Sequence, residues 1–346
     1  MKKKVIIFII LIALFTTCAG NKAVKRSAPP EWLDNPESKY PNNAYISAIG
    51  SGYSRSDAEK DATAKLSRIF RTNVSATETM EKRYEELTRG KETSAEDYTR
   101  SVKNVTLSSE ESLVNTQFGE SYTDSKAQVH TIAYLDRFAT GNIYEEMISG
   151  NSKQVRFYLN KSTGLSNPMD KYAYAGAAWM IAQKNEDLLR QYKIISPQMS
   201  SLYNPEYDVN AIQNNYVETA REITFSFKFQ GDEDKRIENI VSRILTAEGF
   251  QIVSNSGYIS INGSLNMSLT DLNREDDTIF YRWDMSLNLT QPDGKTILSL
   301  NPSGRSGSIS EQEAKSRVYI DIEKKLDKTL KRELNSWFDN IVITGK

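Results

Sequence analysis

Alternation of hydrophobic and polar residues is most regular in the last third of the chain. Residues 223–229, 259–269 and 279–289 each carry an apolar side chain at every second position, which predicts strands with one buried face. Two shorter apolar segments, at 250–253 and 296–300, have strand length. A turn signal, Gln-Pro-Asp-Gly, precedes the second of these segments. Alternating patterns are typical of antiparallel sheets, so we expect one here.

Helical spacing replaces alternation in two parts of the same region. Apolar residues between 237 and 245 recur at three- and four-residue intervals, and Gly249 provides a natural stop. A longer helix is predicted from Ser310, with Glu313 as its capping partner, and its apolar stripe runs through Leu334 to Trp337. The expected order is therefore β-α-β-β-β-β-α, with both helices on one face of the sheet.

A strand, a turn and a helix are predicted in the first folded part of the chain. Residues 45–50 form a short apolar segment, followed by Gly50-Ser51-Gly52. Ser56 and Glu59 form the S-x-x-E capping pattern, and the residues from 58 to 70 repeat with helical spacing. A Gly-Ser-Gly turn before a helix N-terminus is also able to cradle a phosphate. We favour a purely structural turn, because the fuller phosphate-binding patterns do not follow it.

The pattern between this helix and residue 137 is weaker. A strand is expected at 72–76, and 77–112 suggest a partly exposed helix or extended arm. Residues 113–122 and 127–135 predict a β-hairpin, with odd-numbered residues of the second strand on one face. His130 lies on the opposite face of that strand. We interpret it as a hydrogen-bonded structural residue rather than a catalyst.

Residues 138–200 are rich in alanine, leucine and aromatic residues at helical spacing, which predicts two or three helices. Tyr172, Tyr174 and Trp179 in this segment form either a docking surface or part of the core, and the spacing favours the core. Residues 201–221 contain proline and several asparagines and predict a linker.

The extreme N-terminus has the pattern of an export signal. Three lysines at 2–4 precede about eleven apolar residues. This run is shorter than the roughly 20 residues that a membrane-spanning helix requires. The chain's one cysteine, Cys18, follows immediately and precedes a polar stretch.

Cys18 resembles the acylated cysteine in the lipobox of bacterial lipoproteins, although Phe15 and Thr17 replace the more usual residues of that motif. The resemblance implies removal of residues 1–17 and lipidation of Cys18. An unpaired thiol invites oxidation in an exported protein, and a thioether-linked lipid removes that liability. Ordinary cleavage nearby, for example after Ala19, is the alternative. In the lipidated protein, residues 18–30 would form a short tether.

The first folded region resembles the LPP20 family of bacterial lipoproteins. The resemblance rests on Pro30-Glu31-Trp32, on the stretch YISAIGSG at 45–52, and on the alanine-bearing helix at 58–70. It covers about residues 30–137 and implies an envelope lipoprotein without catalytic residues. The C-terminal stretch GFQIVSNSGYISINGSL more faintly resembles domains of curli-export and peptidoglycan-synthase-activating lipoproteins.

Composition narrows the possible functions further. The net charge of −1 argues against general nucleic-acid binding, which requires a basic face. A single histidine and a single cysteine cannot form a Cys/His zinc site or a thiol–imidazole dyad. The acidic residues 232–234 suit a helix start, and 271–277 suit a solvated loop more than a calcium site.

The sequence therefore predicts an exported α+β lipoprotein. Its predicted parts are a signal peptide at 1–17, a tether at 18–30, an α/β sandwich-like domain at 31–137, helices at 138–200, a linker at 201–221, and an antiparallel α+β domain at 222–346. We expect no enzymatic activity, cofactor or metal, and no nucleic-acid partner. The expected site residue is Cys18.

The expected function is that of a binding, structural or assembly module. Its partners would be the membrane, through the lipid anchor, and envelope proteins. The expected location is the outer membrane, on its periplasmic face or at the cell surface. An activator of a peptidoglycan synthase is the alternative. An envelope hydrolase would need acids such as Glu31, Asp34 and Asp136 to converge.

Overall fold

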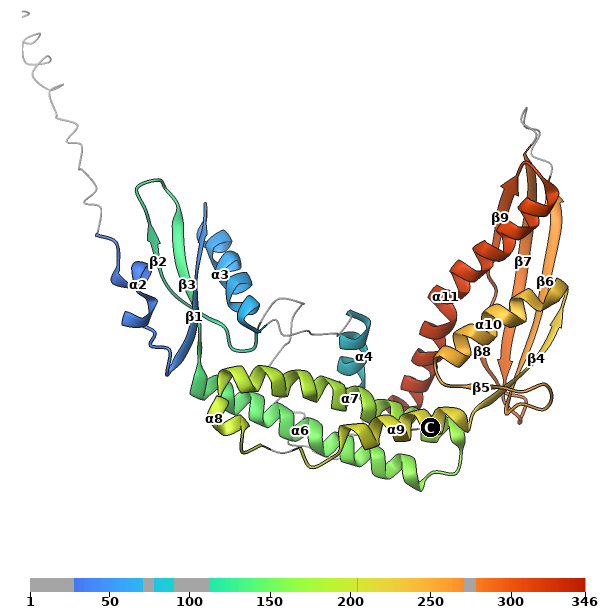
Figure 1. Cartoon of the computed structure of the whole chain (residues 1–346), viewed down its shortest axis with the longest axis horizontal. Coiled ribbons are helices and arrows are strands. Elements are labelled where there is room, and N and C mark those ends of the chain that lie inside the picture. Colours follow the sequence, from blue (N-terminus) through green and yellow to red (C-terminus); the bar gives the residue numbers. More distant parts are fainter. Residues whose placement is uncertain (1–27, 71–77, 90–112, 204, 271–277, 346) are drawn as a thin grey trace, which may run out of the picture.

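The computed structural model describes residues 28–70, 78–89, 113–203, 205–270 and 278–345. Two sheets lie at opposite ends of an elongated molecule, and long helices run between them (Figure 1). The predicted α+β class is confirmed. No helix in the described ranges is long and apolar enough to cross a membrane. The segments 1–27, 72–76, 90–112 and 271–277, and the predictions made for them, lie outside the described residues.

Three antiparallel strands form the N-terminal sheet, in the order β1-β3-β2. They are β1 (Tyr45–Gly52), β2 (Gln117–Thr123) and β3 (Val129–Asp136). The predicted hairpin is thus confirmed. Ala133 and Leu135 of β3 pack with helix α3 (Arg55–Phe70), whereas Ile132 packs with Trp32 and Tyr40. Trp32 belongs to α2 (Glu31–Asp34), and Tyr40 lies in the loop that follows η1 (Pro36–Ser38). Both faces of this sheet are therefore covered.

Helix α3 packs directly on the backbone of β1. A Cβ atom at Gly50 would lie 2.1 Å from Ala58 O and 2.1 Å from Ala62 N. At Gly52 it would lie 2.5 Å from the Cβ of Asp57. The prediction of a turn at 50–52 was wrong: these residues belong to β1, and close helix–strand packing explains the two glycines.

The N-terminal cap of α3 differs from the predicted one. Ser54 Oγ accepts a hydrogen bond from Asp57 N–H at 3.2 Å and donates to Asp57 Oδ2 at 2.7 Å. The cap is therefore Ser54 with Asp57, and the prediction of Ser56 with Glu59 was wrong. Ser-x-x-Asp works in the same way as the predicted pattern but satisfies the N–H of Asp57, two residues earlier.

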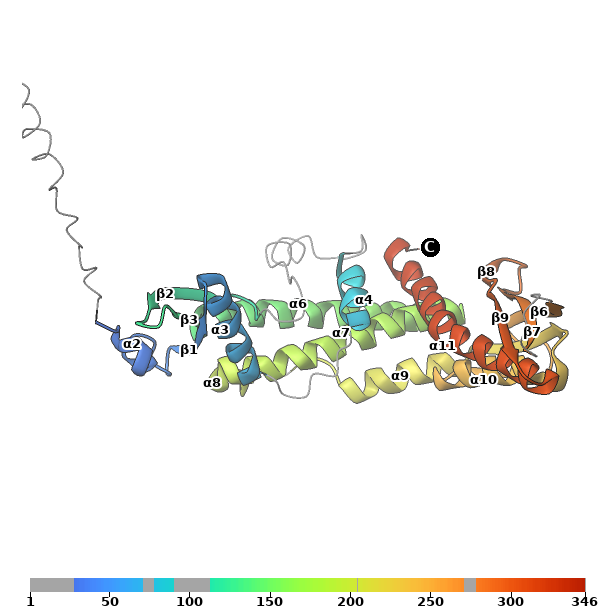
Figure 2. The ribbon, with the colours of Figure 1, turned by 90° about the horizontal axis from the view of Figure 1, so that it is seen from above.

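The predicted helices of the middle segment are confirmed. Helices α6 (Arg137–Gly164) and α7 (Pro168–Ile195) pack along each other, and α8 (Pro197–Ser200) follows. Residues 209–221, expected to be part of a linker, form helix α9 (Val209–Arg221) instead. Asp208 Oδ1 caps α9 by accepting from Asn210 N–H at 2.8 Å, and Ile212 and Ala220 are buried. Helix α4 (Glu78–Arg89) lies against this group of helices (Figure 2).

Six strands form the C-terminal sheet. They are β4 (Thr224–Gln230), β5 (Gln251–Ile252), β6 (Ile259–Thr270), β7 (Ile279–Thr290), β8 (Thr296–Leu300) and β9 (Ser303–Ser308). The order is β5-β4-β6-β7-β8, and β9 also pairs with β7. Pairing is antiparallel from β6 to β9, as predicted, but β4 joins β5 and β6 in parallel. Helix α10 makes this parallel pairing possible, because it carries the chain across between β4 and β5.

Two helices cover one face of the C-terminal sheet, as predicted (Figure 1). They are α10 (Arg236–Ala247), preceded by η2 (Glu233–Lys235), and α11 (Glu311–Thr344). Ser310 caps α11, as expected, by accepting from Glu313 N–H at 3.3 Å. The predicted stop after α10 is confirmed, since Gly249 has a φ of +90°. The division of the chain into domains stays a prediction.

Replacing Gly50 with alanine should destabilise the protein by about 1–3 kcal/mol, because the added methyl overlaps the backbone of α3. Urea unfolding followed by circular dichroism measures the change in the free energy of unfolding. Gly164→Ala is the matched control: nothing lies within 4 Å of that added Cβ. The control should change the free energy of unfolding by less than about 1 kcal/mol. Equal effects of the two substitutions would contradict the packing argument.

Candidate functional site

A serine, a histidine and an aspartate form a hydrogen-bonded chain at one end of the N-terminal sheet. Ser51 Oγ lies 3.0 Å from His130 Nδ1, and His130 Nε2 lies 3.3 Å from Asp124 Oδ2. The imidazole is mostly buried, with 15% of its side chain exposed. His130 is thus a hydrogen-bonded residue, as the sequence analysis favoured.

Strand register and a local turn create this arrangement. Ser51 of β1 and His130 of β3 are direct cross-strand partners. Asp124 lies in the β2–β3 turn, where its Oδ1 accepts from Lys126 N–H at 2.8 Å and Gln128 N–H at 2.9 Å. The Gln128 N–H, and then the contacts with His130 and Lys126, hold the pKa of Asp124 below its ordinary value, although burial opposes them.

The tautomer of His130 follows from its partners. An ionised carboxylate only accepts hydrogen bonds, so Nε2 carries the proton that is directed at Asp124. In the neutral ring, Nδ1 then accepts from the Ser51 hydroxyl. This is the proton arrangement of a Ser-His-Asp catalytic triad, with the two ring nitrogens exchanged.

A second acid accepts a hydrogen bond from the backbone of Ser51. Asp61 Oδ2 of α3 accepts from Ser51 N–H at 2.9 Å, and Lys65 Nζ donates to Ile49 O at 3.1 Å. Lys65 and Asp61 also form an ion pair at 2.8 Å. The serine's own N–H is therefore already engaged and does not serve as an oxyanion donor. These contacts also occupy edge groups of β1, which protects the edge from pairing with another strand.

A second polar site joins α4 to α11. Arg83 Nε and Nη2 donate to Asp339 Oδ2 and Oδ1 at 2.6 Å and 2.8 Å, a bidentate ion pair. The side chains are 25% and 8% exposed. Burial is the largest single influence and lowers the pKa of Arg83, but the hydrogen bonds to Asp339 and the charge attraction of Asp339 together raise the pKa above its ordinary value. Tyr172 and Tyr216 lie nearby, with ring centroids 4.9 Å apart and hydroxyls 2.6 Å apart.

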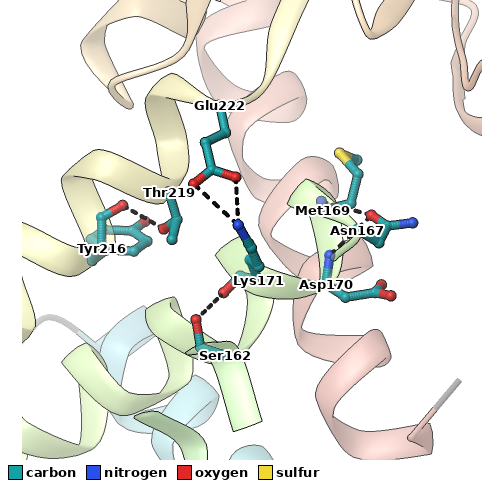
Figure 3. A network of polar contacts seen from close by, with 8 residues as sticks. All are labelled: Ser162, Asn167, Met169, Asp170, Lys171, Tyr216, Thr219 and Glu222. Atoms are coloured by element: carbon teal, nitrogen blue, oxygen red, sulfur yellow. Dashed lines mark hydrogen bonds and ion pairs between the residues drawn. The ribbon is translucent and has the colours of Figure 1, made fainter. Parts of the chain in front are cut away.

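Figure 3 shows how the ends of three helices meet. Lys171 of α7 donates to both carboxylate oxygens of Glu222, just after α9, at 3.0 Å and 3.4 Å. Ser162 of α6 donates to Lys171 O at 2.9 Å, and Asn167 caps α7 by accepting from Met169 N–H at 2.8 Å. All of these contacts fix helix ends, so the network is structural.

A buried polar cluster lies between α6 and α7. Asn185 Nδ2 donates to Tyr207 Oη at 2.8 Å and to Ser152 Oγ at 3.2 Å. Ser152 Oγ lies 3.3 Å from Tyr203 Oη. Burial raises the pKa of Tyr207 to about 12, although the hydrogen bond from Asn185 opposes the shift. The cluster attaches the segment before α9 to the helical pair.

Two of the acids considered from sequence, Asp136 and Asp232, serve as helix caps. Asp136 Oδ1 accepts from Ala139 N–H at 2.9 Å at the start of α6. Asp232 accepts from Ile237 N–H at 2.9 Å and Glu238 N–H at 3.0 Å at the start of α10, as its sequence position predicted. Glu31 and Asp34 lie on α2 and are not part of the Ser51–His130–Asp124 chain. In the described part of the chain, no group of three or more His, Cys, Asp or Glu could hold a metal.

The remaining predicted site residues have mixed outcomes. Tyr172 and Tyr174 are buried, at 2% and 3% exposure, so the core interpretation is confirmed for both. Trp179 is partly buried against the same core. Cys18 lies outside the described residues, and its lipidation stays a prediction.

Sequence reasoning missed Ser51 as the partner of His130 and missed the pair Arg83–Asp339. A signal for the first existed: both residues lie at the same end of two predicted strands. No local signal existed for the second, since 256 positions separate the two residues.

Comparison with known proteins identifies no family for this chain. No family model and no curated protein matches the chain. A secreted protein of Helicobacter pylori is 11% identical, covers 82% of this chain and 98% of its own, and has a TM-score of 0.40. A minor lipoprotein of Acinetobacter baumannii is 11% identical over 36% of this chain and 94% of its own, with a TM-score of 0.24. Rare lipoprotein B of Shewanella oneidensis is 14% identical, covers 36% of this chain and 99% of its own, and also has a TM-score of 0.24.

The structurally similar proteins thus include one secreted protein and two lipoproteins. Similarity at this level supports no conclusion about function. The resemblance to LPP20 lipoproteins stays a prediction from the residues that carry it.

The raised pKa of Tyr207 predicts that the protein loses stability at alkaline pH. Its folded-state pKa of about 12 lies above the unfolded value, which is near 10. Its neutral form therefore stabilises the fold below about pH 10, and this contribution disappears as the pH rises through about 12. Tyr207→Phe should flatten the fall in the free energy of unfolding across this window, measured by urea titration at several pH values. Tyr53→Phe, at a residue that is 92% exposed, is the control and should leave the pH profile unchanged.

Proposed function

We propose that this chain is a non-enzymatic accessory protein of the bacterial cell envelope, anchored by a lipid on Cys18, which binds or assembles envelope proteins. The observation that carries the proposal is its extended scaffold. Helices α6 and α7 have 28 residues each, a length of about 42 Å, and they separate two sheet-containing ends (Figure 1). Such an arrangement holds two surfaces apart, as a connecting protein requires.

The use of polar groups supports a binding role. Asp136 and Asp232 cap helices, Lys171–Glu222 joins helix ends, and Arg83–Asp339 fastens α4 to α11. Polar groups that satisfy backbone and ion-pair partners stabilise a scaffold, which supports a role in binding.

The N-terminal sequence supports the location. A basic head, an apolar run and Cys18 fit export followed by lipidation. Several acyl chains would anchor the protein stably, whereas a single chain binds a membrane only marginally. Outer-membrane attachment, on either face, is part of the proposal. Within the same function, one version assembles surface or motility structures, and the other activates a peptidoglycan synthase.

Replacing Cys18 with serine should release the protein from the membrane, because the thiol that carries the lipid is lost. We expect the wild type to incorporate radiolabelled palmitate and to fractionate with membranes, and Cys18→Ser to do neither. Chemical crosslinking of living cells, followed by mass spectrometry, should join the wild type to envelope proteins and the variant to far fewer.

The mass of the mature N-terminus provides the control. Acylated Cys18 as the first residue supports the anchor, whereas a chain beginning at Gly20 shows ordinary cleavage. A wall synthase among the crosslinked proteins favours activation, and surface or motility proteins favour assembly. Without reproducible crosslinks, the binding role would be wrong.

A hydrolase is the second candidate, and the observation that favours it is the hydrogen-bonded series Ser51–His130–Asp124. The binding proposal predicts that a fluorophosphonate probe will not label Ser51, because the N–H of that residue is engaged by Asp61. Mass spectrometry of the treated protein checks this, with Ser54→Ala as the matched control for Ser51→Ala. Labelling that disappears in Ser51→Ala, and not in Ser54→Ala, would favour the hydrolase.

A further inference from the structure

Helix α4 is held by specific polar contacts on three other helices. Tyr84 Oη donates to Asn151 Oδ1 of α6 at 2.9 Å, and Tyr158 Oη of α6 donates to Leu87 O at 3.4 Å. The Lys184 ammonium of α7 lies 5.7 Å from the centroid of the Tyr84 ring. The Arg83–Asp339 pair joins α4 to α11. We call Asn151, Tyr158, Lys184 and Asp339 the α4-docking surface.

Asp339 determines what this surface accepts. Its side chain is only 8% exposed, and both carboxylate oxygens are bound by the Arg83 guanidinium. A buried carboxylate without a cation is costly to desolvate, so this surface favours an occupant that supplies a positive charge at this point. A guanidinium suits the bidentate geometry better than an ammonium does. Asn151 Oδ1 adds an acceptor, which favours a hydroxyl-bearing aromatic residue next to the arginine.

Helix α4 depends on docking for its order. The helix has 12 residues, with the sequence ETMEKRYEELTR, and most of them are charged. Among its described side chains, Tyr84 and Leu87 are the buried ones. An isolated helix of this length is marginal in water, so its order depends on docking.

We propose that the α4-docking surface is an acceptor for an amphipathic helix of a partner protein, and that α4 occupies it in cis until the partner displaces it. The partner helix carries an arginine, a tyrosine beside it and a leucine three residues further on, as α4 does at Arg83, Tyr84 and Leu87. The inference rests on the proposed binding function and specifies the chemistry of one partner. Charge complementarity with Asp339 is what selects this occupant.

Displacement follows from the nature of the contacts. An ion pair and two hydrogen bonds can be exchanged one for one with an incoming helix, without leaving Asp339 unpaired at the end point. In the wild type, α4 competes at the millimolar effective concentration typical of a tethered segment, which keeps the acceptor closed to weak binders. Helix-in-groove recognition elsewhere uses the same i, i+3 spacing of anchors.

A labelled peptide with the sequence of residues 78–89 tests the acceptor. The full chain with Arg83→Ala, Tyr84→Ala and Leu87→Ala should bind this peptide roughly tenfold or more tightly than the wild type, by fluorescence anisotropy. Adding Asp339→Asn should weaken that binding roughly tenfold or more. Asp327→Asn, an exposed position on the same helix, is the matched control and should leave affinity unchanged. Equal binding by all of these chains would overturn the proposal.

A second measurement leaves α4 intact and so does not depend on the triple variant folding. A photo-crosslinking amino acid replaces Lys184 in living cells, and the exposed Lys153 of α6 is the control position. Crosslinks from position 184 to another protein, mapped by mass spectrometry to a helix with the stated arginine, tyrosine and leucine, support the proposal. Crosslinks only to α4 or only to a second copy of this chain overturn it.

Different results would contradict the acceptor inference and the proposed binding function. If chemical crosslinking joins the protein to envelope proteins but position 184 reaches none of them, the acceptor inference is wrong and the binding function stands. If no envelope protein is ever joined to the chain, the proposed function fails whatever the peptide shows.

Discussion

The apolar stripe of α11 is the constraint on which the arrangement of the molecule depends. This helix has 34 residues and a length of about 50 Å. Its buried residues recur at four-residue intervals from Ala314 to Leu334 and end at Phe338 and Val342. A stripe of this length must be covered along its whole length. The first half packs on the C-terminal sheet, and the second half packs on α7 and α4 (Figure 1).

Because one rigid helix serves both contacts, the sheet and the helical pair keep a fixed relation to each other. An aromatic cluster reinforces the junction: the ring of Tyr172 lies 4.5 Å from that of Phe338 and 5.0 Å from that of Phe250. Aromatic contacts of this kind add to the burial of their apolar surface. The ion pair Arg83–Asp339 lies on the same half of α11, so α4 is attached next to this aromatic cluster.

The two ends of the molecule use their polar groups differently. At the N-terminal sheet, Ser51, His130 and Asp124 link strands and a turn, and Asp61 and Lys65 occupy backbone groups at the edge of β1. At the C-terminal sheet, Arg317 and Lys325 of α11 donate to Gly307 O and Ser303 O of β9. Both arrangements protect strand edges, which are otherwise prone to unwanted pairing. A protein that presents sheets at both ends benefits from such protection.

Local patterns in the sequence determined the elements of this protein. Alternation predicted β6 and β7, helical spacing predicted α3, α7, α10 and α11, and the roles of Ser310, Asp232 and Gly249 followed from their positions, because caps and periodicity involve neighbours within a few residues. The cap of α3 was misplaced, since Ser54 and Ser56 are both plausible caps and only packing selects between them. Helix α9 was missed because its polar residues resemble those of a linker.

Tertiary structure alone decided the relations between elements. The parallel pairing of β4 depends on how α10 crosses the sheet, the meeting of Ser51 with His130 depends on strand register, and Arg83 reaches Asp339 only through the packing of α4 on α11. Register and packing minimise the free energy of the whole chain, and no short window of sequence contains that information. The sequence by itself determined most of the helices and strands, and the fold decided which polar groups meet.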